Sequence, residues 1–313
     1  MTIDELIKKI KETKKEPSYD EDGMKRLQLT AQEYSGEYKL IWSEDLLEEI
    51  KKRPKLVKYK IGLTHLDELT NGFSLQQLIT IAGSTKHGKS TFSLFIMDRL
   101  KELNPVMIPL EQSNEEIITQ RYDNKYFIPH FLSPSKLASS VTVDWIEERV
   151  VEGIAKYNTK IVVIDHLGYI DDMGPNGKYK RENLAYRIEI IMRGLKNIAK
   201  KWNIIVVLLV HISQKDEAKP PTMKDIKNSS SIAQESDTVM SIWRKNKKSH
   251  NVQIYDNKTM ISVLANRRNG TNGNVGLIFN KTTGWFDESQ SWVDSMEDMA
   301  RQQIDSEDFF DEY

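Results

Sequence analysis

The stretch IAGSTKHGKSTF, residues 81–92, decides the fold. It places glycines, lysines and hydroxyl side chains between two apolar runs, and residues 83–90 match the pattern G-x-x-x-x-G-K-[ST]. A strand that ends in glycine and restarts as a helix behind Gly-Lys-Ser leaves several backbone N–H groups pointing into one small space, with a cation beside them. Because this arrangement suits a polyphosphate, the sequence predicts a P-loop at residues 83–90.

The P-loop pattern assigns a task to each of its polar groups. The amides of residues 86–90 would cradle the β-phosphate, Lys89 would bridge the β- and γ-phosphates, and the Ser90 hydroxyl would bind magnesium. We therefore predict ATP and Mg²⁺ as cofactors. The predicted nucleotide-binding residues are Gly83, Ser84, Thr85, Lys86, His87, Gly88, Lys89, Ser90 and Thr91.

The chain around the P-loop has the pattern of an α/β protein. From about Lys60 to Phe286, apolar strands alternate with helices, which is typical of a parallel sheet covered on both faces. The clearest helix is predicted at 182–202, where apolar residues recur at spacings of four and three. We expect a P-loop NTPase core with a mostly parallel central sheet flanked by helices. The predicted strands are 78–82, 106–110, 161–165, 204–210, 238–243 and 260–265.

Three polar residues come at the ends of predicted strands, the edge at which open α/β sheets bind ligands. Asp165 is the predicted second magnesium ligand, or else an aspartate that only ends its strand. Glu111 is the predicted general base, or else a cap of the helix that starts near Ser113. His211 is either a structural histidine or a polar group near the γ-phosphate that reports its loss.

Composition limits the class of protein. The 313 residues are 39% hydrophobic, and the absence of cysteine excludes disulfides and thiolate metal sites, as suits a reducing compartment. The chain has no run of about 18 apolar residues. Its charged start, MTIDELIKKIKETKK, also lacks the apolar stretch of a signal peptide. We expect a cytoplasmic protein, bacterial or in the host of a virus, with no membrane partner.

Charge and pattern divide the chain into three predicted segments. Residues 1–59 form an N-terminal extension with a helix near 43–52, in which Ser43 is the expected N-cap. Residues 60–286 form the ATPase core. Residues 287–313 carry ten acidic side chains and one basic one, a balance of −9 that leaves +8 on the rest. We expect this tail to be disordered, or to dock in a basic groove of a partner protein.

Several longer segments carry a resemblance to a known family. These are GLTHLDELTNGFSLQQLITIAG at 62–83, PLEQ at 109–112, IDHLGYI at 164–170, DIKNSSSIAQESDTVMSIWR at 225–244 and ANRRNGTNGNVGLIF at 265–279. In this order they resemble the RecA-fold domain of DnaB-type hexameric replicative helicases over roughly residues 55–286. The resemblance implies a RecA-like core and the activity of an ATP-driven DNA helicase in DNA replication. It also implies a ring, usually of six subunits, with ATP bound between neighbouring subunits and single-stranded DNA in the central channel.

The resemblance also implies roles for particular residues. Arg268 matches the arginine finger that reaches the γ-phosphate on the adjacent subunit, whereas the lysine usually found two residues earlier is Asn266. His211 matches a phosphate sensor. The implied DNA-binding residues are Lys227, Asn228, Ser229 and Ser230, with Lys178, Lys180 and Arg181 in a second loop.

At the N-terminus the sequence departs from the bacterial members, which carry a separate helical collar domain. We expect this chain to lack the collar and to form its ring through the helix at 43–52. The family's partners would be primase, a helicase loader or single-strand-binding protein. Two alternatives stay open: a RecA/RadA-like recombinase or mediator ATPase without unwinding activity, and a non-motor adaptor whose assembly ATP switches.

Overall fold

The chain divides into two compact units, Met1–Leu56 and Val57–Tyr313. A computed structural model describes residues 43–52, 57–123, 131–132, 141–170, 184–212, 219–226, 229–249, 252–289 and 291–294. In the first unit it describes one helix, α3 (Ser43–Lys52), which has the predicted bounds and buries none of its residues. Among all these residues, no helix combines the length and apolar character that crossing a bilayer requires.

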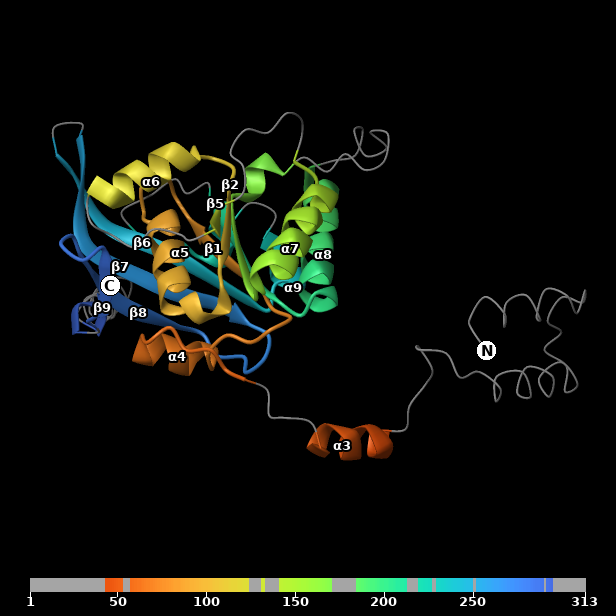
Figure 1. Cartoon of the computed structure of the whole chain (residues 1–313). Coiled ribbons are helices and arrows are strands. Elements are labelled where there is room, and N and C mark those ends of the chain that lie inside the picture. The colour runs from red at the N-terminus through yellow and green to blue at the C-terminus, as the bar shows by residue number, and fades with distance from the viewer. Residues whose placement is uncertain are drawn as a thin grey trace, which may run out of the picture. The chain divides into compact units, whose positions relative to one another are not determined.

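The second unit is built on a single sheet of nine strands in the order β3-β2-β4-β5-β1-β6-β7-β8-β9 (Figure 1). The pairs from β3 to β6 are parallel, whereas β6 to β9 are antiparallel, so the predicted mostly parallel α/β sheet is confirmed. The strands are β1 (Leu78–Gly83), β2 (Val106–Pro109), β3 (Phe131–Leu132), β4 (Ile161–Asp165), β5 (Ile205–His211), β6 (Thr238–Ser249), β7 (Val252–Asn266), β8 (Gly273–Asn280) and β9 (Trp285–Glu288).

The antiparallel part of the sheet is larger than the strand pattern predicted. The predicted strands 238–243 and 260–265 are the buried halves of β6 and β7, which continue as a hairpin to Ser249 and Val252. The added residues are mostly charged and polar, so hydrophobic patterning gave no signal there. Strand β9 pairs with β8 up to Glu288. The domain boundary at Phe286 stays a prediction.

Helices cover both faces of the sheet, as predicted. They are α4 (Thr64–Thr70), α5 (Lys89–Arg99), α6 (Asn114–Asp123), α7 (Val143–Tyr157), α8 (Leu184–Lys201) and α9 (Ser229–Glu235), and α8 is the helix predicted at 182–202. Successive side chains on a strand point to opposite faces. Ile79 and Ile81 therefore pack in one core with α4 and α5, while Leu78 and Ala82 pack in the other with α7 and α8.

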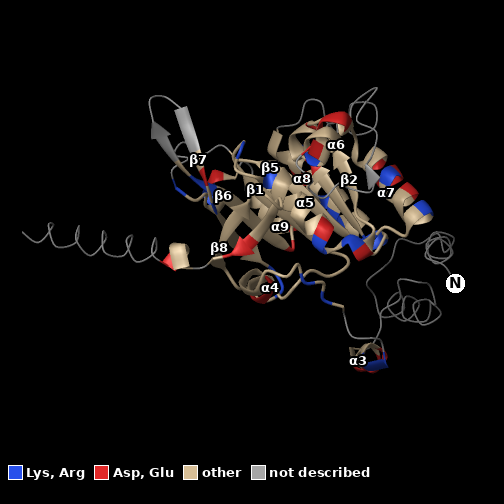
Figure 2. Cartoon of the chain, turned by 60° about the vertical axis from the view of Figure 1, so that its left-hand side comes forward, with Lys and Arg blue, Asp and Glu red and all other residues tan. Residues whose placement is uncertain are grey.

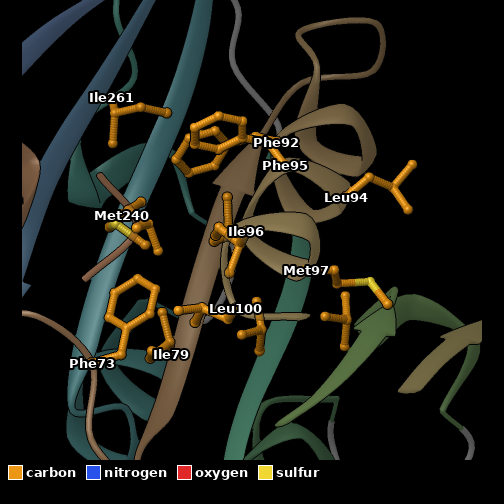
Figure 3. Close-up of a cluster of buried hydrophobic side chains, with 14 of the residues drawn as sticks. Phe73, Ile79, Phe92, Leu94, Phe95, Ile96, Met97, Leu100, Met240 and Ile261 are labelled. Carbon is orange, nitrogen blue, oxygen red and sulfur yellow. The ribbon is translucent and has the colours of Figure 1, made fainter. Parts of the chain in front are cut away.

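Helix α5 is buried on nearly every side, whereas α7 and α8 are amphipathic. Figure 3 shows Phe92 and Ile96 of α5, and Leu100 directly after the helix, on the side that faces Ile79 and Met240. Helix α7 carries both acidic and basic residues along its length (Figure 2), and the exposed Glu152 pairs with Arg149 and Lys156. The apolar sides of these helices fix the strands that carry the site, and charged side chains remain in contact with water.

A buried ion pair joins α8 to the starts of β1 and β6. The ammonium of Lys196 donates to Asp237 Oδ2 and, at 3.0 Å, to the Gln76 carbonyl oxygen. The same carboxylate oxygen accepts the Leu78 N–H at 2.7 Å. Burial lowers the pKa of Lys196, and the Asp237 carboxylate opposes that shift.

Candidate functional site

The predicted P-loop connects β1 to α5 in a backbone conformation that depends on its glycines. Gly88 has a φ of 95° and Lys86 a φ of 68°, both in the left-handed region, which is easy for glycine and uncommon for lysine. An added Cβ at Gly83 would lie 2.8 Å from the carbonyl oxygen of Ile242. The glycines therefore let the loop turn tightly into the N-terminus of α5, where unpaired backbone N–H groups favour an anion.

The other predicted binding residues of the loop differ in exposure. Thr85 and Lys86 are exposed. His87 is buried, and its Nδ1 accepts the Arg244 N–H at 2.9 Å, so its side chain braces the loop against β6. Thr91 borders a cavity of about 50 Å³ between α5 and the antiparallel strands.

Lys89 lies folded back on the loop. Its Nζ donates to the carbonyl oxygens of Gly83 at 2.9 Å and Ser84 at 3.0 Å, and lies 3.3 Å from Nδ1 of His211. Burial lowers the pKa of Lys89 to about 8, against the opposing charges of Asp165 and Glu111. The side chain is thus a buried cation held beside the space where the phosphates would lie.

The two predicted magnesium ligands are in direct contact. Ser90 Oγ donates to Asp165 Oδ2 at 2.6 Å, which links the start of α5 to the end of β4. Burial raises the pKa of Asp165, and the Ser90 hydrogen bond opposes the shift. Its second oxygen, Oδ1, is buried and has no hydrogen-bond partner among the described residues. A hydroxyl beside a carboxylate with a spare oxygen fits Mg²⁺, which is bound through few protein oxygens and several waters.

Glu111 lies two residues beyond Pro109, the last residue of β2. The N–H groups of Leu110 and Glu111 both donate to the carbonyl oxygen of Asp165, which fixes this turn to the end of β4. The cap of α6 is made by Ser113 and Glu116, which bond reciprocally at 3.0 Å. Glu111 is therefore not the cap that its structural alternative required, and its carboxylate instead faces two histidines.

The two histidines are His211, which was predicted, and His166, which was not. Nε2 of His211 lies 3.3 Å and Nε2 of His166 lies 3.5 Å from Glu111 Oε2. The rings pack edge to face, with centroids 4.1 Å apart. Burial and the neighbouring His211 lower the pKa of His166 to about 4, so this imidazole is neutral at physiological pH. The pattern contained a signal for His166, since it directly follows Asp165 in IDHLGYI.

The site thus collects polar residues that lie at or just beyond the carboxyl ends of four neighbouring strands, β2, β4, β5 and β1. In a comparison with known families, the DnaB-like helicase C terminal domain matches residues 59–130 and 134–288, most of the chain. This chain belongs to that family.

Individual DnaB-like proteins are similar at low identity. A probable replicative DNA helicase of Trieres chinensis is 28% identical over 274 residues, 75% of this chain and 58% of the relative. The replicative DNA helicase DnaB of Geobacillus stearothermophilus is 26% identical over 307 residues, 85% of this chain and 66% of the relative. The chain therefore spans less than two thirds of the length of these curated relatives.

Two solved structures share the fold. One is an isolated ATPase domain, which superposes with a TM-score of 0.61 at 20% identity and covers 78% of this chain and 95% of that chain. A DnaB-like replicative helicase, described together with its interactions with primase, has a TM-score of 0.61 at 19% identity, covering 90% of this chain and 73% of that chain. The RecA-like expectation for the core is thereby confirmed.

In this DnaB-like domain Arg268 lies far from the phosphate site of its own chain. It is exposed in the turn after β7. Thr238, at the start of β6, pairs both with Ile79 of β1 and with Asn266 at the end of β7. The turn after β7 is therefore at the amino edge of the parallel strands, whereas the P-loop is at their carboxyl edge.

Asn266, where the resemblance implies a lysine, makes hydrogen bonds within its own protomer. Its Nδ2 donates to the Leu69 carbonyl oxygen at 3.0 Å, and its Oδ1 accepts the Arg268 N–H at 3.1 Å. Asn269 and Thr271 donate to the same Leu69 oxygen, at 3.2 and 2.6 Å. The turn that presents Arg268 is thus tied to the C-terminal end of α4.

The predicted DNA-binding residues are only partly described. Lys178, Lys180, Arg181, Lys227 and Asn228 lie outside the described residues, as does most of the acidic tail. Ser229 begins α9, and Ser230 is exposed on its first turn. The assignment of these residues to DNA stays a prediction.

Proposed function

We propose that this chain is the motor domain of an ATP-dependent DNA helicase that encircles single-stranded DNA and translocates along it during DNA replication. The observation that carries the proposal is the convergence of Lys89, the Ser90–Asp165 pair and Glu111 at one edge of a sheet whose chain belongs to a helicase family. Its curated relatives are named replicative DNA helicases.

Nucleotide binding would begin at the P-loop. The amides at the start of α5 receive the β-phosphate, and Lys89 exchanges its contacts with the Gly83 and Ser84 carbonyl oxygens for the β- and γ-phosphates. Ser90 and Asp165 would hold Mg²⁺, which when bound neutralises charge on the phosphate oxygens. The Ser90–Asp165 contact keeps both ligands in place before nucleotide arrives.

Hydrolysis requires a group that orients water towards the γ-phosphate. Glu111 is the best-placed carboxylate, because the Asp165 carbonyl oxygen anchors its backbone beside the Ser90–Asp165 pair. His211 contacts both Lys89 and Glu111, so loss of the γ-phosphate would change its contacts and could be passed on through β5.

We infer that Arg268 completes the site from the neighbouring subunit. Its place at the amino edge of the sheet keeps it from its own P-loop, and its exposed turn is free to meet another subunit of a ring, which we propose to be a hexamer. Single-stranded DNA would contact Lys227, Asn228, Ser229, Ser230 and the loop with Lys178, Lys180 and Arg181, mainly through phosphates. Such a motor would work in the cytoplasm, with primase, a loader or single-strand-binding protein as partners.

A second candidate is a RecA-like DNA-dependent ATPase that does not unwind. The observation that favours it is Asn266, because its side-chain amide donates to the Leu69 carbonyl oxygen within the same protomer and adds no positive charge to a neighbouring site. On this alternative the ATPase chemistry at the sheet edge is unchanged and only strand separation is absent.

Strand displacement on a forked duplex tests the proposal. The wild-type protein should release the labelled strand with ATP and Mg²⁺ but leave a blunt duplex intact, because a ring needs a free single-stranded arm. Lys89→Ala and Glu111→Gln should abolish release. Robust DNA-stimulated ATP hydrolysis without any release would favour the second candidate, and unwinding that survives both substitutions would refute the site assignment.

A further inference from the structure

The carboxylate of Glu111 is approached by two imidazoles from two different strands. His211 ends β5 and places Nε2 at 3.3 Å from Oε2, while His166 follows β4 and places Nε2 at 3.5 Å from the same oxygen. Only His211 matches a residue to which the family resemblance gives a task. The question is what His166 contributes at this position.

The hydrogen bonds on the far side of each ring fix where its proton lies. Gly168 N–H donates to His166 Nδ1 at 3.0 Å, so that nitrogen is an acceptor and the proton is on Nε2. The Lys89 ammonium faces Nδ1 of His211 in the same way. Both imidazoles therefore turn an N–H towards Glu111 Oε2. That of His211 is at hydrogen-bond distance, whereas that of His166, at 3.5 Å, is longer, as catalytic contacts often are before substrate binds.

The local sequence is built to hold His166 in this orientation. A Cβ at Gly168 would lie 2.7 Å from His166 Cε1, closer than real Cβ contacts, so glycine is needed for the ring to fold over its own turn. The ring of Tyr169 packs against the His166 ring, with centroids 4.9 Å apart. Contacts with Gly168 and Tyr169 of its own turn, together with the His211 ring, therefore hold the imidazole in place.

A transition-metal site is the other chemistry that these three residues allow. The ligand atoms of Glu111, His166 and His211 all lie within 4.8 Å of one another, a spacing that suits a tetrahedral ion. A bound metal needs the lone pair of each Nε2, and metal-binding histidines donate from the other nitrogen. Here both Nδ1 atoms accept hydrogen bonds, so the surroundings favour N–H donors over metal ligands.

We propose that His166 is a positioning residue for Glu111, holding the carboxylate through its Nε2–H so that the other oxygen faces the attacking water. The inference rests on the proposed role of Glu111 as the general base. Without His166 the carboxylate is held by the His211 N–H alone and can rotate about that one contact. The loss of one hydrogen bond to a charged group corresponds to roughly tenfold in turnover.

Two substitutions separate the donor from the rest of the side chain. An Asn at 166 reaches about as far as Nδ1 and can keep the Gly168 contact, but it cannot reach Glu111. A Gln reaches about as far as Nε2 and restores an N–H donor, with room from the cavity of about 620 Å³ that borders the ring. His166→Asn should lower kcat for ATP roughly tenfold with KM within about twofold, and His166→Gln should recover most of it.

Combining these substitutions with Glu111→Ala shows whether His166 acts through Glu111. Under single-turnover conditions His166→Asn should cause no further loss in the Glu111→Ala background. An unchanged kcat in His166→Asn, an equal loss in His166→Gln, or a full additional loss in the double variant would each overturn the inference alone. If Glu111→Ala kept wild-type turnover, the proposed base would be wrong as well.

Discussion

Mixing two inactive variants tests whether the site is completed by a second subunit. From Ile79, which is level with Asn266, to Gly83 there are four strand steps, or roughly 13 Å at about 3.3 Å per residue. An extended arginine side chain is roughly 7 Å long at standard bond lengths. Arg268 therefore cannot reach the phosphate site of its own protomer while the sheet is intact.

The first variant is Lys89→Ala, which keeps its arginine but cannot bind phosphate productively. The second is Arg268→Ala, which keeps its P-loop; arginine fingers contribute on the order of 10³-fold or more to turnover. In a random equal mixture, an Arg268→Ala subunit meets a Lys89→Ala neighbour at about one quarter of the interfaces, if each contact runs head to tail. ATP hydrolysis measured after co-assembly should rise from near zero towards about a quarter of the wild-type rate.

The matched control is a mixture of Lys89→Ala with the Lys89→Ala, Arg268→Ala double variant, which has no competent interface. Light scattering or electron microscopy must show the same assemblies in each sample. Absence of any recovery in assemblies that contain both variants would refute completion in trans, as would wild-type turnover by Arg268→Ala alone at high dilution.

Three further substitutions, the first with a control variant, probe the frame around the site. Asp237→Ala should lower the free energy of unfolding by about 3–5 kcal/mol in denaturant titration, because it leaves Lys196 buried without its counter-charge. The control Glu235→Ala, which breaks the exposed pair with Arg193, should cost under about 1 kcal/mol. Similar costs for the two variants would contradict this prediction. Gly83→Ala should weaken binding of a fluorescent ATP analogue at least about tenfold, since the added Cβ would lie 2.8 Å from the Ile242 carbonyl oxygen and 3.2 Å from Lys89 Cγ. An unchanged affinity would show that the loop can shift to make room. Asn266→Ala should reduce the turnover of ATP several-fold with the affinity for ATP unchanged, and should lower the free energy of unfolding by about 1 kcal/mol. An effect on ATP affinity alone would argue against a role of Asn266 in holding the Arg268 turn.

The P-loop and the sheet could be predicted because their signals are local. Gly83, Gly88 and Lys89 lie within seven residues of one another, and the apolar runs of β1, β4 and β5 are long enough to read as buried strands. Those two signals also predicted Asp165 and His211 at the strand ends, since parallel strands bring their carboxyl ends to one edge.

The contacts that sequence reasoning missed depend on which strands are neighbours. His166 meets Glu111 because β4 lies between β2 and β5, an order that no local pattern encodes. Asn266 gave a signal only as a departure from the family's lysine, and its bond to Leu69, 197 residues away along the chain, depends on where α4 packs. The charged outer half of the β6–β7 hairpin carries too little hydrophobic alternation to be read as strand.

The direction of one strand explains why a single chain holds only part of the proposed site. Strands β2, β4, β5 and β1 run parallel, so Glu111, Asp165, His211 and Lys89 all emerge at one edge. Strand β6 runs the same way, but β7 is antiparallel to it, and the turn after β7 must therefore lie at the opposite edge. Moving Arg268 to its own phosphate site would require β7 to reverse. A second protomer that turns its amino edge towards the first one's carboxyl edge needs no such change, and the same step repeated around an axis closes a ring.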